Sequence, residues 1–169
     1  MPDLATLNRL EEGAFVALLG GVFEHAAWVA EAAAPQRPFA SLADLHAAMM
    51  RAVHAAAPDL QLAFLNGHPE LAGPEARARS LTDDSASEQG SAGLDRMAEA
   101  EAAEFARLNA AYRARFGFPF IIAVRGRGRA EILSVFEARL GRDPAVEREA
   151  ALGEVAQITR MRLERLIGA

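Results

Sequence analysis

The stretch that decides the fold class is Phe116-Gly117-Phe118-Pro119-Phe120-Ile121-Ile122-Ala123-Val124, because its residue pattern favours a strand over a helix. It is short, apolar and rich in aromatic and β-branched residues, and these features predict a buried strand. No other segment offers a convincing partner strand. A lone extended segment must find other partners for its amides and carbonyls, and a polar ligand is one candidate.

Apolar residues at helical spacing describe the rest of the chain. We expect helices over residues 11–19, 22–33, from 42 through 53 to a close before Pro58, 92–115 and 130–140, and a last helix that opens at Pro144. Gly20-Gly21 should end the first of these, and Ser41 should cap the third. A chain of 169 residues is long enough to bury one core without disulfides or a structural metal. The expectation is a single domain over residues 1–169.

Composition excludes several kinds of site. The chain has no cysteine, so it has no disulfide framework, thiolate nucleophile or cysteine-based metal site. Its formal charge of −5 argues against a nucleic-acid partner, which requires a clustered positive field. The one basic cluster, Arg125-Gly126-Arg127-Gly128-Arg129, is interpreted as a solvated turn.

The sequence gives no sign of a membrane or a targeting signal. No stretch approaches the roughly twenty consecutive apolar residues of a membrane span. The first residues do not combine a basic region with an apolar run, and Ile167-Gly168-Ala169 is not a peroxisomal address. We therefore expect a cytoplasmic protein with no membrane partner.

The first candidate motif is His68-Pro69-Glu70-Leu71-Ala72-Gly73, which follows the turn signal Asn66-Gly67. A residue before proline is pushed out of the α region, so His68 should lie on bent, non-helical backbone. Two interpretations remain open. The imidazole either hydrogen-bonds within the turn, or acts as a general acid or base, for which its ordinary pKa of about 6.5 is suited.

The second candidate motif is Ser85-Ala86-Ser87-Glu88-Gln89, followed by Gly90 and Gly93. Ser85 and Glu88 fit a capping box, in which the serine caps a helix and the glutamate folds back onto its first turn. That interpretation leaves Gln89 and the two glycines unexplained. Small residues there would let a ligand or another backbone approach closely.

Arg162 is the third candidate. On the last helix, about 100° per residue places Arg162 inside the stripe formed by Val155, Ile158 and Leu166, while Arg160 faces away. A guanidinium directed into an apolar face is costly unless it meets an anion. The anion is either a buried Asp or Glu, or an anionic substrate.

A set of short runs, in this order and spacing, resembles the OHCU decarboxylase family. They are Phe23-Glu24-His25, Pro38-Phe39, His68 to Gly73, Ser85 to Gln89, Ala92-Gly93-Leu94, Phe116 to Phe120 and Met161-Arg162-Leu163. The resemblance extends from about Leu10 to Ile167. These enzymes act on 2-oxo-4-hydroxy-4-carboxy-5-ureidoimidazoline in the breakdown of urate.

The resemblance implies an all-α enzyme without cofactor or metal, commonly a homodimer, that releases carbon dioxide to give (S)-allantoin. It implies a compact multi-helix fold with one short extended segment around Phe118–Val124, outside any sheet. The family's catalytic residues map to His68, Glu88 and Arg162. Its substrate contacts map to Pro69, Ser85, Gln89, Phe120, Ile121 and Ile122, the last three through their backbone.

Two other functions fit the same residues. One is a non-catalytic helical interaction module, which expects Arg162 to pair with an internal carboxylate and expects no hollow between the two central motifs. The other is a lyase or hydrolase that acts on another small ureido or imidazoline compound.

Overall fold

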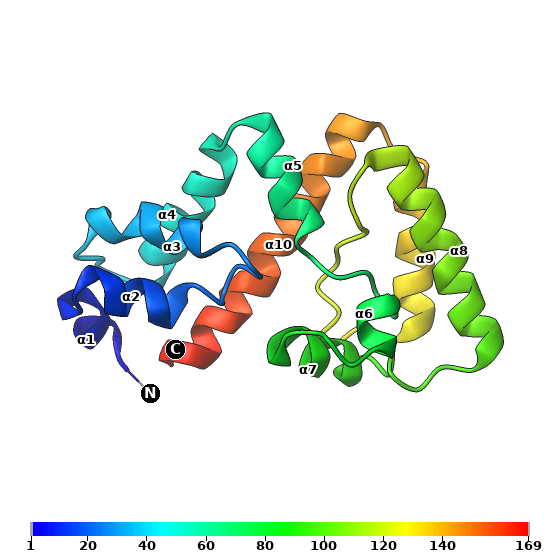
Figure 1. Cartoon of the computed structure of the whole chain (residues 1–169), viewed down its shortest axis with the longest axis horizontal. Helices are drawn as coiled ribbons and strands as arrows, with labels where there is room; N and C mark the ends of the chain where they lie inside the picture. The colour runs from blue at the N-terminus through cyan, green and yellow to red at the C-terminus, as the bar shows by residue number, and fades with distance from the viewer. Residues whose placement is uncertain (1, 169) are drawn as a thin grey trace. The chain divides into compact units, whose positions relative to one another are not determined.

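The computed structural model describes residues 2–168, without the side chain of Arg77. Within this range the chain forms helices and no strand, which confirms the all-α prediction (Figure 1). The helices are α1 (Leu4–Arg9), α2 (Glu12–Leu19), α3 (Ala27–Ala33), the 3-10 helix η1 (Ala34–Gln36), α4 (Leu42–Ala55), α5 (Pro58–Asn66), α6 (Pro74–Arg77), α7 (Asp83–Ser91), α8 (Glu99–Phe116), α9 (Arg129–Leu140) and α10 (Pro144–Ile167). None of the helices in the described part is long and apolar enough to cross a membrane.

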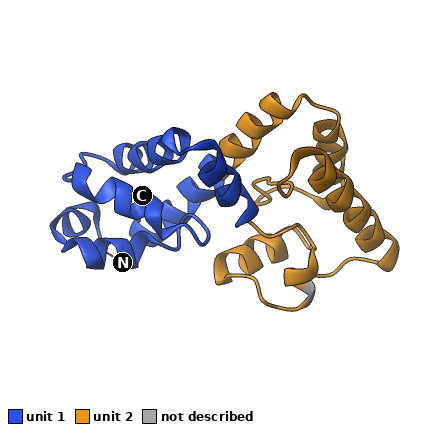
Figure 2. Cartoon of the chain, turned by 45° about the horizontal axis from the view of Figure 1, so that its top comes forward, with its two compact units in different colours: residues 1–67, 156–169 blue, residues 68–155 orange. Residues whose placement is uncertain are grey.

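The chain divides into two compact units (Figure 2). Unit 1 comprises Met1–Gly67 and Ala156–Ala169, and unit 2 comprises His68–Val155. Helix α10 contributes its first half to unit 2 and its second half to unit 1. The single domain over 1–169 therefore remains a prediction, and each unit is described by itself.

In unit 1, α3 packs against α2 and α4. The apolar residues Leu45, Met49 and Val53 recur along one face of α4 and are fully buried. Ser41 caps this helix as predicted, because its hydroxyl accepts a hydrogen bond from the Asp44 amide at 3.1 Å. Burial of the apolar face and a satisfied first turn together fix where α4 begins and which side it buries.

The predicted helix over 22–33 begins later than the sequence indicates. Residues 22–25 form a turn closed by a hydrogen bond from the Ala26 amide to the Phe23 carbonyl, and α3 starts only at Ala27. Glu24 and His25 have φ of 21° and 24°, a region that residues other than glycine seldom adopt. Such strained backbone persists when its surroundings over-determine it. Here the Glu24 side chain is buried against Arg162, as described below.

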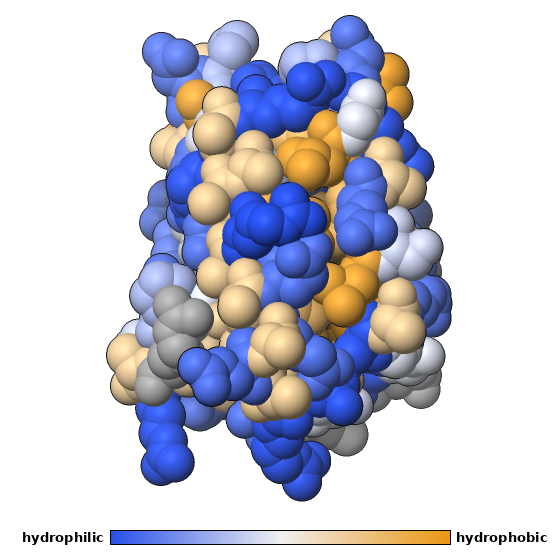
Figure 3. All heavy atoms as spheres, turned by 90° about the vertical axis from the view of Figure 1, so that its right-hand side faces the viewer, coloured by the Kyte–Doolittle hydropathy of each residue, from blue (hydrophilic) through white to orange (hydrophobic). Residues whose placement is uncertain are grey.

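In unit 2, α8 packs against α9 around a cluster of aromatic rings. Phe120 stacks on Phe136 with ring centroids 3.8 Å apart and planes 9° apart. Tyr112 meets both rings edge-on. Figure 3 shows the side of the molecule that carries α8, where hydrophilic atoms separate small apolar areas. The core of unit 2 is therefore aromatic and lies beneath a mixed surface.

Residues 117–128, between α8 and α9, are irregular, with an extended run up to Val124. The strand suggested by residue pattern alone is wrong, and the extended segment implied by the family resemblance is correct. Phe118 to Val124 is buried nonetheless. In the basic cluster that follows, Arg125 and Gly126 form a turn as predicted, whereas Arg129 is the first residue of α9. Arg127 lies near Glu131 and Glu154, and Arg129 lies near Glu101.

The boundaries of α7 differ from the sequence interpretation. Thr82, not Ser85, caps the helix, and its hydroxyl accepts from the Ser85 amide at 3.3 Å. The helix ends at Ser91, and Gly93 just beyond it has φ of 72°. The Leu94 amide donates to the Gln89 carbonyl at 3.1 Å. This is a Schellman ending, in which a left-handed glycine is favoured. Helix α8 therefore begins at Glu99 and not near residue 92.

The two glycines at this ending are expected to respond oppositely to alanine. Gly93→Ala forces a side chain into left-handed backbone and should lower the free energy of unfolding by about 1 kcal/mol. Gly90 lies within α7, and a Cβ there would meet only Asp95, at 4.0 Å. Gly90→Ala should therefore raise the free energy of unfolding by roughly 0.5 to 1 kcal/mol. Urea unfolding followed by far-UV circular dichroism measures the free energy of unfolding of both variants. A change of the same sign and size in the two variants would contradict this role for Gly93.

Candidate active site

His68 lies in the loop between α5 and α6, on non-helical backbone as predicted. Its side chain is buried, with 7% of the residue exposed, and Pro69 beside it is half-buried. Burial in the loop holds the imidazole in place. An imidazole is a side chain that can donate or accept a proton, so this group can serve as a general acid or base.

The loop turns back on itself at its end. The Gly73 amide donates to the Glu70 carbonyl at 3.3 Å, and Ala72 has φ of 51°. A Cβ on Gly73 would lie 2.6 Å from the Cβ of Glu70, closer than real side chains approach. Glycine is therefore required here by the close approach of two parts of the loop.

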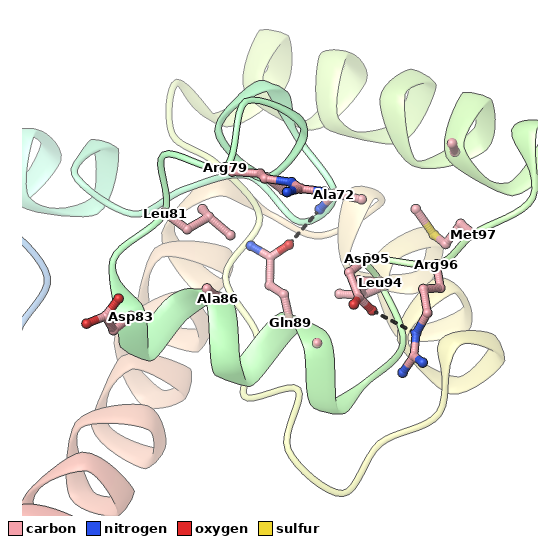
Figure 4. A pocket seen from close by; sticks show the side chains of 13 residues that line it. Ala72, Arg79, Leu81, Asp83, Ala86, Gln89, Leu94, Asp95, Arg96 and Met97 are labelled. Carbon is pink, nitrogen blue, oxygen red and sulfur yellow. Dashed lines mark hydrogen bonds and ion pairs between the residues drawn. The ribbon is translucent and has the colours of Figure 1, made fainter.

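Gln89 of α7 joins the two candidate motifs (Figure 4). Its Oε1 accepts from the Ala72 amide at 2.9 Å, and its Nε2 donates to the Glu70 carbonyl at 3.3 Å. Gln89 is buried, so these bonds form away from water, where an unpaired amide would be costly. The stretch that carries His68 and the helix that carries Glu88 are thereby tied together within unit 2.

Two residues of α8 hold the same loop from another side. Asn109 Nδ2 donates to the Leu71 carbonyl at 2.9 Å, and Arg113 Nε donates to Glu70 Oε1 at 2.9 Å. Sequence reasoning missed both. The signal for Asn109 was present, because a polar residue stands beside Leu108 on a helix face that is otherwise buried and apolar.

Ser85, Glu88 and Gln89 share one face of α7, because residues three and four apart lie above one another on a helix. Ser85 and Gln89 are buried, and Glu88 is half-buried. Since Gln89 contacts the His68 loop, this face is the one that α7 turns toward the loop. The arrangement places a carboxylate and a hydroxyl on the helix face next to the loop that carries the imidazole.

An open groove of about 850 Å³ is lined by both motifs. Ala72 comes from the loop, and Ala86 and Gln89 come from α7. Figure 4 shows Arg79, Asp83, Asp95 and Arg96 around this groove, with Gln89 reaching across toward Ala72. Of the candidate site residues, Gln89 lines this groove, whereas His68, Pro69, Ser85 and Glu88 are not among its lining residues.

The segment Phe120–Ile122 is also in unit 2, and its residues are almost fully buried. Side chains take the place of a partner strand at two backbone groups. Arg139 Nη1 donates to the Ile121 carbonyl at 2.8 Å, and Glu154 Oε2 accepts from the Ala123 amide at 2.9 Å. These two buried backbone groups therefore hydrogen-bond to charged side chains, because buried backbone groups outside a sheet still need hydrogen-bond partners.

Arg162 is in unit 1, on the second half of α10. It is 4% exposed, whereas the Arg160 side chain is 45% exposed, so the predicted orientation of the two is confirmed. Arg162 Nη1 lies 2.7 Å from Glu24 Oε2, and Glu24 is also buried. Of the two anions that the sequence allowed, the structure shows the internal carboxylate. Sequence reasoning did not assign Glu24 any role.

The described residues contain no group of three or more His, Asp or Glu arranged to hold a metal ion. The candidate residues in unit 2 offer an imidazole, a carboxylate, amides and backbone groups. Such a set can bind a polar substrate and move a proton.

A family model described as OHCU decarboxylase matches residues 8–164. The chain is 41% identical over 160 residues to 2-oxo-4-hydroxy-4-carboxy-5-ureidoimidazoline decarboxylase from Haloferax volcanii, covering 95% of this chain and 93% of that one. It is 40% identical over 161 residues to the uric acid degradation bifunctional protein PucL from Bacillus subtilis, of which it spans 32%.

Two solved structures are similar. One, of an (S)-allantoin synthase, has a TM-score of 0.77 and 32% identity, and the match covers 98% of this chain and 54% of that one. The other, of an OHCU decarboxylase in the presence of (S)-allantoin, has a TM-score of 0.70 over 95% of this chain and 100% of that one. At 23% identity the second supports the fold alone.

Proposed function

The chain belongs to the OHCU decarboxylase family, and from this premise we propose that it decarboxylates 2-oxo-4-hydroxy-4-carboxy-5-ureidoimidazoline to (S)-allantoin in urate breakdown. The observation that carries the proposal is the tie made by Gln89, which joins the loop of His68 to the helix of Glu88. These are the residues onto which the family's catalytic histidine and glutamate map.

The proposed reaction needs no cofactor. When the carbon–carboxylate bond breaks, its electron pair remains on a ring carbon, and the adjacent carbon–nitrogen double bond and amide delocalise it. A proton then has to reach one face of that carbon. A group within about 3 Å directs such a transfer, and we assign this task to His68. Delivery of the proton to one face makes the product handed.

The other residues bind and orient. Glu88 orients the imidazole or holds the ureido group, and Ser85 and Pro69 make further contacts with the substrate. A primary amide has two N–H donors and two acceptor lone pairs, so Gln89 retains capacity to read the substrate's amide edges. Phe120, Ile121 and Ile122 contribute through their backbone, and Arg162 binds a carbonyl or carboxylate oxygen. A homodimer and a cytoplasmic location remain part of the proposal, on the family resemblance and the sequence.

The test is handedness of the product. We expect the purified full-length protein, given freshly generated substrate, to release carbon dioxide and to produce a circular dichroism signal of (S)-allantoin. The same substrate left without protein should decay to product without net optical activity. A racemic product at the uncatalysed rate would contradict the proposal.

One observation favours the interaction-module alternative, namely that Arg162 has an internal carboxylate partner in Glu24. The alternative of another ureido or imidazoline substrate is tested by offering such compounds in the same assay. Faster turnover of one of them would replace the substrate named here.

A further inference from the structure

A buried network of charges lies in unit 2 outside the residues assigned above. Arg139 and Glu147 are 2% and 0% exposed. Arg139 Nε donates to Glu147 Oε1 at 2.7 Å, and Nη2 lies 2.6 Å from the same oxygen. The Tyr112 hydroxyl donates to that oxygen as well. Burial and the nearby Glu147 raise the pKa of Tyr112, so the phenol keeps the proton that it donates.

The network continues into the extended segment. Arg139 Nη1 donates to the Ile121 carbonyl at 2.8 Å, and the Arg139 guanidinium lies 4.5 Å from the centre of the Phe120 ring. One side chain therefore contacts a carboxylate, a backbone carbonyl and an aromatic face at once. The planar fork of arginine can do this, whereas a lysine ammonium on its flexible stem cannot.

Stability alone does not account for such a network. Two charges removed from water are costly, and replacement of a buried ion pair by apolar residues is often neutral or stabilising. A buried ion pair can also select a single well-defined conformation. Here Arg139 binds a segment that is not part of a sheet, so no strand pairing fixes the conformation of that segment. The contacts of Arg139 fix the carbonyl of one residue and the ring of its neighbour.

We propose that Arg139, oriented by Glu147 and Tyr112, is a positioning residue that fixes the backbone of residues 120–123 for substrate binding. This inference rests on the proposed function, in which that backbone contacts the substrate. Arg139 itself acts through the segment. A segment held in one conformation binds substrate and transition state to the same degree, so its loss should appear in KM and leave kcat nearly unchanged.

The test is Arg139→Lys in the full-length chain. Lysine keeps the charge but reaches either Glu147 or the Ile121 carbonyl, not both. We expect KM to rise about tenfold with kcat within about twofold of wild type, as the loss of one charged hydrogen bond predicts. Hydrogen–deuterium exchange followed by mass spectrometry should show faster exchange in peptides that cover residues 120–123.

Arg107→Lys is the matched control, because Arg107 forms an exposed pair with Glu104 on α8. It should leave KM and exchange unchanged. Tyr112→Phe removes one donor to Glu147 but keeps the bond to Ile121, so KM should rise only about twofold to threefold. If Arg139→Lys does not fold, Tyr112→Phe decides, and wild-type KM and exchange in that variant overturn the inference.

Wild-type KM in a folded Arg139→Lys protein would overturn it as well, and so would a lowered thermal midpoint with unchanged exchange at 120–123. Failure of the proposed function is distinguishable, because the wild-type protein itself would then form no handed product. In that case exchange alone decides: faster exchange confined to residues 120–123 supports positioning, and unchanged exchange rejects it.

Discussion

Replacing His68 by alanine is expected to remove most of the (S)-allantoin formed from freshly generated substrate. General acid–base catalysis by a positioned side chain contributes about 10²- to 10⁴-fold, and the rate should fall by that amount. The far-UV helix signal should stay unchanged, because His68 lies in a loop that is tied to α7 and α8 through Glu70, Leu71 and Ala72. The assay is the growth of optical activity with time.

His54→Ala is the matched control. His54 is exposed on the last turn of α4, in unit 1, and has no part in the proposed chemistry. The same substitution there should leave the rate within about twofold of wild type, as is usual for a surface position. Full activity in His68→Ala would end the assignment of the proton transfer to His68.

Replacing Glu24 by alanine is expected to cause the largest loss of stability. It leaves the Arg162 guanidinium buried without its carboxylate, and breaking a buried pair in this way costs about 3 to 5 kcal/mol. The measurement is urea unfolding followed by the fluorescence of Trp28, the one tryptophan. Trp28 packs edge-on against Phe64 in unit 1, so it reports the unit that contains both partners.

Glu164→Ala provides the comparison on the same helix. Glu164 pairs with Arg160 at 2.7 Å, but both side chains are exposed, and such a pair contributes only about 0.2 to 0.5 kcal/mol. The double change Glu24→Ala with Arg162→Met should recover much of the loss, because no unpaired charge remains. A cost for Glu24→Ala no larger than that for Glu164→Ala would show that the buried pair does not stabilise unit 1.

Local pattern was enough to predict where α4 and α10 begin and which side of α10 is buried. Ser41 caps α4, Pro144 opens α10, and the wheel of α10 correctly separates Arg162 from Arg160. Each of these features depends on residues within a few turns of one helix. The bent backbone at His68 was predictable for the same reason, since Pro69 restricts the residue before it.

Features that depend on distant residues were not predictable. The partner of Arg162 stands 138 positions away at Glu24, in a turn that the apolar pattern of 22–33 presents as helix. The Ile121 carbonyl and the Ala123 amide find side chains 18 and 31 positions away, so the segment has no need of a second strand. Ser85 fitted the sequence pattern of a helix cap, but the cap is Thr82, three residues earlier, and the helix begins at Asp83.

The most direct test of the account asks where (S)-allantoin binds. Amide chemical shifts of the labelled wild-type protein are recorded with (S)-allantoin and then with (R)-allantoin, each at a concentration at which the (S) form inhibits the reaction. The account predicts shifts at His68 to Gly73, along α7 and at residues 120–123, larger for the (S) form. Shifts confined to other parts of the chain, or equal for the two forms, would contradict it.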